Sequence, residues 1–212
     1  MILYFISLFV HLITLNQACG LSDRFNGGDT EFYTKVSNTI EYPVSNITGT
    51  VLVNWTIDNG EIVDVRILNK VDPTLDKEVL KAIKKTKGRW IKGDYSCSFT
   101  MPVVFSIGSY QSLEEYPPHY LSPVIVSRNG STDTFVSDKK LMDMLNDYLV
   151  QENYRKALST LNDIIVRYPM NIQIREARIK CSNKLNMNKE ACLDIDFLLV
   201  QLGVKSASSC MN

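Results

Sequence analysis

The stretch Thr50–Leu68, TVLVNWTIDNGEIVDVRIL, decides the fold of this chain. Apolar side chains recur at every second position on both sides of Asp58-Asn59-Gly60, which is the period of a β-strand. Asn-Gly tolerates the positive φ angles of a tight turn, so the stretch predicts an antiparallel hairpin. A lone hairpin does not bury its own faces, and we therefore expect a third strand and helices beside it.

Two helices are predicted around the hairpin. Apolar residues recur every four positions from Phe32 to Ile40 and predict a helix that Asp29 or Thr30 caps. Asp72-Pro73 has the residue types of a helix cap and first helical position. The apolar stripe of this second helix consists of Leu75, Val79, Ala82 and Ile83.

A third strand is predicted from Cys97 to Ile107, where apolar residues again alternate. Pro102 lies inside this run, and proline donates no hydrogen bond to a neighbouring strand. We therefore expect the strand to lie at a sheet edge or to carry a bulge. An edge strand can accept an extended peptide through main-chain hydrogen bonds, and this is the first indication of function.

A series of short motifs spans residues 25–107. They are Phe25-Asn26-Gly27-Gly28, Phe32, Tyr42-Pro43, Gly49-x-Val51, Asp58-Asn59-Gly60, Leu75-Asp76, Trp90, Gly93 and Pro102-Val103-Val104-Phe105. In this order they resemble the C-terminal domain of TonB, in the version common in Bacteroidetes proteins. One departure is the short spacer Val44–Thr48 before the first strand, which is usually longer in that family.

The resemblance implies an α+β fold with two helices on a three-stranded antiparallel sheet. It also implies a partner, the N-terminal peptide of an outer-membrane transporter, and a role in energy-dependent transmembrane transport. The implied binding residues are Tyr42, Pro43, Phe99, Thr100, Met101, Pro102, Val103 and Val104. The alternative for Tyr42 and Trp90 is plain core packing.

The N-terminus predicts export to the periplasm. Residues 1–18 contain a nearly unbroken apolar run, which has the length of a signal-peptide core and is shorter than a membrane span. Cys19 follows directly and is a candidate lipidation site, although Asn16 stands where bacterial lipoproteins have leucine. An uncleaved membrane anchor is the remaining alternative.

Five cysteines are present, and an exported chain meets an oxidising compartment. Their spacing matches neither a zinc site nor a redox motif. Two interpretations stay open: they are buried apolar residues, or Cys192 and Cys210 form a disulfide that holds the C-terminal tail.

The second half of the chain has a different periodicity. Residues 108–135 are a linker by composition, with one short strand conceivable at Leu121–Val126. From 138 to 203 the apolar period is helical, and Ala157 and Ala191 lie 34 residues apart. This spacing resembles two tetratricopeptide repeats. Because two such repeats are few for an independent domain, we expect them to dock on the first domain or on a partner.

The composition excludes several functions. Basic and acidic residues balance at 23 each, so no overall charge favours nucleic acid. Seven basic residues and one acidic residue lie between Lys77 and Lys92, which we interpret as a solvated helix face. No catalytic motif, metal-ligand cluster or cofactor signature occurs.

We expect one of two functions. The first, which the resemblance implies, is an exported TonB-like module that binds an extended peptide by strand addition. The second is a cell-envelope scaffold whose helical repeats bind a protein partner. Membrane association through the N-terminus and a homodimer through the edge strand are compatible with either function.

Overall fold

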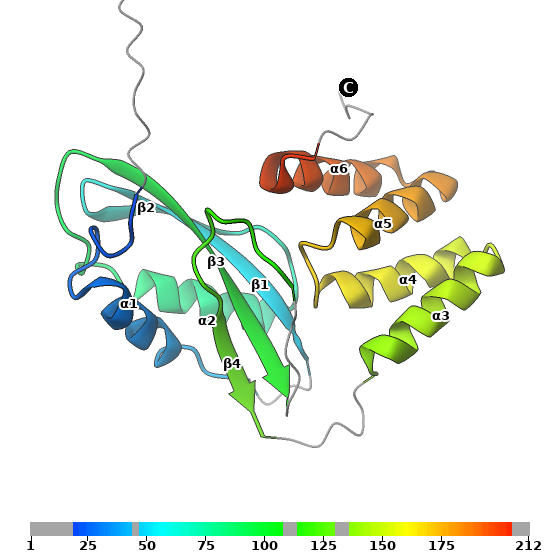
Figure 1. Cartoon of the computed structure of the whole chain (residues 1–212), viewed down its shortest axis with the longest axis horizontal. Coiled ribbons are helices and arrows are strands. Elements are labelled where there is room, and N and C mark those ends of the chain that lie inside the picture. Colours follow the sequence, from blue (N-terminus) through cyan, green and yellow to red (C-terminus); the bar gives the residue numbers. More distant parts are fainter. Residues whose placement is uncertain (1–18, 44–46, 108–113, 130–135, 205–212) are drawn as a thin grey trace, which may run out of the picture.

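The chain folds into a mixed α/β structure in which one sheet and a stack of helices lie side by side (Figure 1). The structure is a computed structural model that describes residues 19–43, 47–107, 114–129 and 136–204. These residues form six helices and one four-stranded sheet with the strand order β2-β1-β3-β4. Within this part of the chain, no helix is both long enough and apolar enough to cross a membrane.

The predicted hairpin is confirmed. Strands β1 (Gly49–Asp58) and β2 (Glu61–Ile67) pair in antiparallel fashion around Asn59 and Gly60. Both turn residues have positive φ, at 48° and 76°, as the Asn-Gly pair predicts. The register shifts between Thr56 and Ile57, and this shift leaves Val63 of β2 without an opposite residue. The result is a β-bulge in the outer strand.

Both predicted helices of the first half are present. Helix α1 (Gly28–Ser37) starts after Gly27, so the expectation that Asp29 or Thr30 caps it is wrong. Gly27 has a φ of 95°, and a left-handed residue turns the chain into the helix without a side-chain cap. Helix α2 (Pro73–Lys84) begins as predicted, with the Asp72 carboxylate accepting the backbone N–H groups of residues 74 and 75.

Alternate residues of the sheet face α1 and α2 and form the main core. Trp55 is fully buried, stacks on Phe32 of α1 and on Phe99 of the third strand, and lies next to Trp90. All four residues of the predicted α2 stripe have no exposed surface. Trp90 is therefore a core residue, which is the plain interpretation of its position in the sequence.

The segment before α1 belongs to this first unit. Phe25 forms an isolated β-bridge with Trp90, and Leu21 and Phe25 are both buried in the main core, so the segment is anchored to this unit. Cys19 forms a disulfide with Cys97. A sulfur in a disulfide carries no lipid, so this disulfide and the predicted lipidation of Cys19 exclude each other. Cys181 is a buried free thiol, and Cys192 is disulfide-bonded. Cys210, which was predicted to pair with Cys192, lies outside the described residues. The predicted signal peptide, residues 1–18, lies outside them as well.

Strand β3 (Ser96–Ile107) pairs with β1 in antiparallel fashion from Ser96 to Phe105. A fourth strand, β4 (Val124–Arg128), lies in the region expected to be a linker and pairs in parallel with β3 from Val103 to Ile107. The expectation that β3 is an edge strand is therefore wrong, and the sheet has four strands where three were expected. Pro102 lies one residue before the β4 pairing begins, so its missing N–H interrupts no bond to β4.

The second half forms two helical hairpins that repeat at an interval of 34 residues. Helices α3 (Asp138–Val150) and α4 (Tyr154–Ile165) form the first, and α5 (Ile172–Lys184) and α6 (Asn188–Leu202) the second. The starts of α3 and α5, and of α4 and α6, are each 34 positions apart. Glu152 and Asn186, the left-handed residues between the helices, keep the same spacing, with φ of 54° and 57°.

The helical hairpins dock on the face of the sheet opposite to α1 and α2. Leu52 points to this face and packs with Tyr120, Met170 and Phe197 in a separate apolar cluster. The backbone N–H of Thr50 donates to the carbonyl of Val166 at 2.7 Å, directly after α4. A β-carbon at Gly49 would lie 2.8 Å from the same carbonyl oxygen, which explains glycine at this close approach.

Candidate functional site

The predicted peptide-binding strand is buried in the structure. Phe99, Met101 and Val103 face the core between the sheet and the two helices. Thr100, Pro102 and Val104 point to the opposite face and are buried as well, and Thr100 accepts a hydrogen bond from the Asn54 amide at 3.0 Å. The outer main-chain groups from Val103 onward belong to the β4 ladder, and the carbonyl of Thr100 accepts the N–H of Leu121 at 2.8 Å.

Tyr42 and Pro43 lie beside the ends of β3 and β4, where Tyr42 contacts Phe105, one residue beyond the predicted stretch Phe99–Val104. The Tyr42 ring packs edge-on against Phe105 of β3 at 5.4 Å, and Arg128 of β4 lies over it, also at 5.4 Å. The carbonyl of Pro43 accepts a hydrogen bond from Arg128 at 3.5 Å. Partial burial raises the pKa of the Tyr42 hydroxyl, which donates to the carbonyl of Ile47.

The connection from β3 to β4 is held by the helical hairpins. The Glu114 carboxylate accepts the backbone N–H of Met170, just before α5 begins. Burial at this position raises the pKa of Glu114 to about 8. Farther along, the Tyr120 hydroxyl donates to the Gln201 side chain of α6 at 2.8 Å. The helices therefore fix the segment that places β4 on β3.

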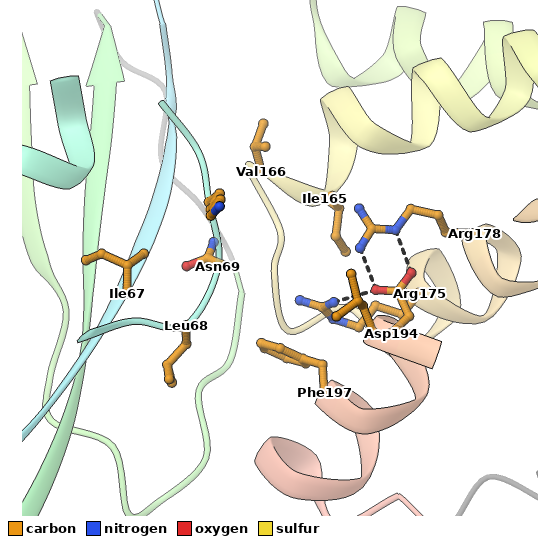
Figure 2. Close-up of a pocket in the computed structure, with 11 residues that line it drawn as sticks. Ile67, Leu68, Asn69, Ile165, Val166, Arg175, Arg178, Asp194 and Phe197 are labelled. Carbon is orange, nitrogen blue, oxygen red and sulfur yellow. Dashed lines mark hydrogen bonds and ion pairs between the residues drawn. The ribbon is translucent and has the colours of Figure 1, made fainter. Parts of the chain in front are cut away.

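A cleft of about 490 Å³ separates the loop after β2 from the helical hairpins (Figure 2). Asp194 of α6 lies in its floor with 1% of its side chain exposed, and it accepts hydrogen bonds from Arg175 at 2.7 Å and from Arg178 at 2.6 Å. Arg175 also stacks on the Phe197 ring at 3.4 Å. Its burial lowers the pKa of its guanidinium to about 10.

These charges serve the fold. A buried carboxylate is stable only when it is paired, and two guanidinium groups from α5 satisfy Asp194 from the neighbouring helix. On the opposite wall, the Asn69 side chain accepts the N–H of Leu52 and donates to the carbonyl of Thr50, which extends the pairing of β1 beyond the end of β2. The polar groups at the cleft thus hold α5 to α6 and the loop to β1.

Comparison of the chain with protein-family models, with curated proteins and with solved structures finds no match. The description of the site is therefore based on the structure of this chain alone. In the described residues, no group of three or more histidine, cysteine or acidic side chains is placed to hold a metal ion.

Sequence reasoning missed β4 as the neighbour of β3. One signal was present, because Met101 to Phe105 is a continuous apolar run in which alternation fails. Such a run is typical of a strand that is buried on both faces, and those strands usually lie inside a sheet. The run therefore favours a central position, against the position that Pro102 suggests.

Proposed function

We propose that this chain is an exported peptide-binding module that works by strand addition, and that β4 is the internal occupant of its binding edge. The observation that carries the proposal is the parallel pairing of β4 with Val103–Ile107. It means that the outer side of β3 accepts an added strand in this chain. Main-chain pairing depends little on side-chain identity, so another extended segment can use the same ladder.

The short length and low burial of β4 support its replacement on β3 by another extended peptide. It is five residues long, and its second residue, Ile125, is 59% exposed. Only Val124 of this strand is fully buried in the main core, with Val126 partly buried beside it. A strand with so few buried side chains gains little hydrophobic stabilisation, since each fully buried valine contributes about 1.5–3 kcal/mol. A competing peptide therefore has a small free-energy difference to overcome.

The resemblance to TonB C-terminal domains supports the identity of the peptide. The order helix, hairpin, helix, strand and the meeting of Tyr42-Pro43 with the end of β3 agree with the site that the resemblance implies. On this basis the ligand is an N-terminal segment of an outer-membrane transporter, and the protein acts in the periplasm. The 34-residue helical hairpins are, in the same proposal, tetratricopeptide-like repeats.

Locked and loosened forms of β4 test the proposal. The hydroxyl oxygens of Ser106 and Ser127 are 2.6 Å apart, so a Ser106→Cys/Ser127→Cys variant can lock β4 onto β3. Val124→Ala/Val126→Ala loosens it by removing side-chain packing. The probe is a fluorescent synthetic peptide with the sequence of residues 121–128, read by anisotropy, and Ser106→Ala/Ser127→Ala is the control for the lock.

We expect the loosened variant to bind this peptide at least about tenfold more tightly than the parent, and the locked variant not to bind it. Equal binding by all forms would refute exchange at this edge. N-terminal peptides of outer-membrane transporters from the same organism should then compete with the probe. If the probe binds and these peptides do not compete, strand addition stands and the transporter assignment fails.

A second candidate function is a cell-envelope adaptor, and helix α6 favours it. Leu193 and Val200 lie two turns apart on this outermost helix and are 63% and 73% exposed. Exposed apolar residues on one helix face are typical of a protein-binding surface. Leu193→Ser/Val200→Ser should abolish binding of such a partner and leave the affinity for the strand peptide unchanged.

A further inference from the structure

The sheet has a second edge, formed by β2, and no described strand pairs with its outer side. The N–H of Leu68 donates to the carbonyl of Leu52 at 2.9 Å, so Leu68 faces β1. In an antiparallel ladder the bonding residues alternate, and Arg66 and Asp64 therefore also face β1. The main-chain groups of Val65 and Ile67 point away from β1, toward the outside of the sheet.

A groove of about 440 Å³ runs beside this edge, between β2 and the end of α2. Its apolar lining comes from β2, where Ile62 and Val65 are half-buried and Val63 is 60% exposed. Its charged lining consists of two exposed lysines of the α2 end, Lys84 and Lys87, and of Asp64 of β2, which pairs with Arg66 at 3.9 Å. The groove thus combines free main-chain groups, an apolar floor and positive charge.

The two lysines are not part of the ion pairs that other basic residues of this run form. Lys81 pairs with Glu78 at 2.9 Å, and Arg89 pairs with Glu31 at 3.2 Å. Among the described residues, no carboxylate lies within ion-pair distance of Lys84 or Lys87. The basic run on this helix is therefore partly neutralised elsewhere and keeps its positive charge at the groove.

We propose that the β2 edge is a second peptide site, which binds an extended acidic segment of a partner protein by strand addition. The added strand pairs with the outward groups of Val65 and Ile67. Alternate side chains of that strand point toward α2, because successive residues of a strand face opposite sides. Acidic side chains at these positions meet Lys84 and Lys87, and this charge complementarity selects the ligand.

The bulge at Val63 limits the register. Pairing with an added strand is restricted to the regular part of β2 from Asp64 to Ile67, because a bulge disrupts the ladder. It also acts against indiscriminate pairing with a second copy of the chain, as do Asp64 and Arg66, whose side chains are exposed at this strand. A short acidic segment fits this edge better than a second β2 strand.

The test uses a fluorescent, end-blocked synthetic octapeptide in which valine and glutamate alternate, with a valine-lysine octapeptide as its counterpart. Anisotropy is measured with the full chain in the Ser106→Cys/Ser127→Cys background, so that the β3 edge stays closed. Lys84→Glu/Lys87→Glu reverses the charge of the groove. Lys77→Glu/Lys85→Glu is the matched control, because these lysines are exposed on or next to α2 and do not line the groove.

We expect the acidic octapeptide to bind, the basic one not to bind, and the groove variant to lose at least about tenfold in affinity while the control variant loses less than about twofold at 0.15 M salt. A Val65→Pro variant, which lacks one outward N–H and leaves the bonds to β1 intact, should lose binding as well.

Three results would overturn the proposal. They are no binding of the acidic octapeptide, equal losses in the groove and control variants, and a dimer in sedimentation that Val65→Pro dissociates. The last result would assign the edge to a second copy of this chain. Because the β3 edge is locked throughout, none of these outcomes depends on exchange of β4.

Discussion

The disulfide between Cys19 and Cys97 gives a prediction with a calculable size. It joins the start of the described chain to the start of β3 and closes a loop with a sequence separation of 78 residues. Cross-linking a loop of this length reduces the entropy of the unfolded chain and stabilises the fold by about 4–5 kcal/mol at 25 °C. Cys19→Ala and Cys97→Ala remove the same cross-link, so each should lower the free energy of unfolding by a similar amount.

Urea unfolding of the purified, oxidised protein, followed by tryptophan fluorescence, measures this change. Cys181→Ala is the control, because Cys181 is a buried free thiol and its replacement removes only local packing, worth about 1 kcal/mol. Both Trp55 and Trp90 lie in the core that the disulfide borders. If Cys19→Ala and Cys97→Ala each cost no more than the control, this cross-link does not stabilise the protein and the reasoning is refuted.

Three further predictions concern the contact between the sheet and the helices, and urea unfolding checks each of them. Leu52→Ala should cost about 2–5 kcal/mol, because Leu52 is fully buried between the two parts. Gly49→Ala should cost about 1–3 kcal/mol, because its β-carbon would lie 2.7 Å from a methyl group of Val71 and 2.8 Å from the Val166 carbonyl oxygen. Burial raises the pKa of Glu114 to about 8, so the folded state holds a proton that the unfolded chain has already released near neutral pH. Stability should therefore decrease as pH rises from 6 to 9, and Glu114→Gln should remove this part of the decrease; a steeper decrease in the variant would contradict the reasoning.

Sequence patterns correctly predicted the elements whose conformation is determined by residues close together in the sequence. The hairpin follows from alternation and from the conformational freedom of Asn59-Gly60, and the start of α2 follows from Asp72-Pro73. The 34-residue repeat was visible because each hairpin buries equivalent positions, such as Ala157 and Ala191. In each case the physical cause lies within one or two elements.

The pairings that join distant segments were not predictable in this way. The pairing of β4 with β3 depends on helices that come later in the chain, because these helices hold Glu114 and Tyr120 in place. The partner of Cys97 is far away in sequence, and no spacing rule selects Cys19 over the other cysteines. Leu52 lies on the face of β1 opposite to α1 and α2, and its burial likewise depends on residues of the second half, such as Phe197.

The most direct test of the central claim is whether β4 lies on the outer side of β3. Disulfide mapping by mass spectrometry compares Ser106→Cys/Ser127→Cys, an opposed pair in the parallel register, with Ser98→Cys/Ser127→Cys, which lies outside that register. The structure predicts near-complete cross-linking of the first pair under mild oxidation and little of the second. Equal yields, or no cross-link between positions 106 and 127, would show that β4 does not occupy this edge.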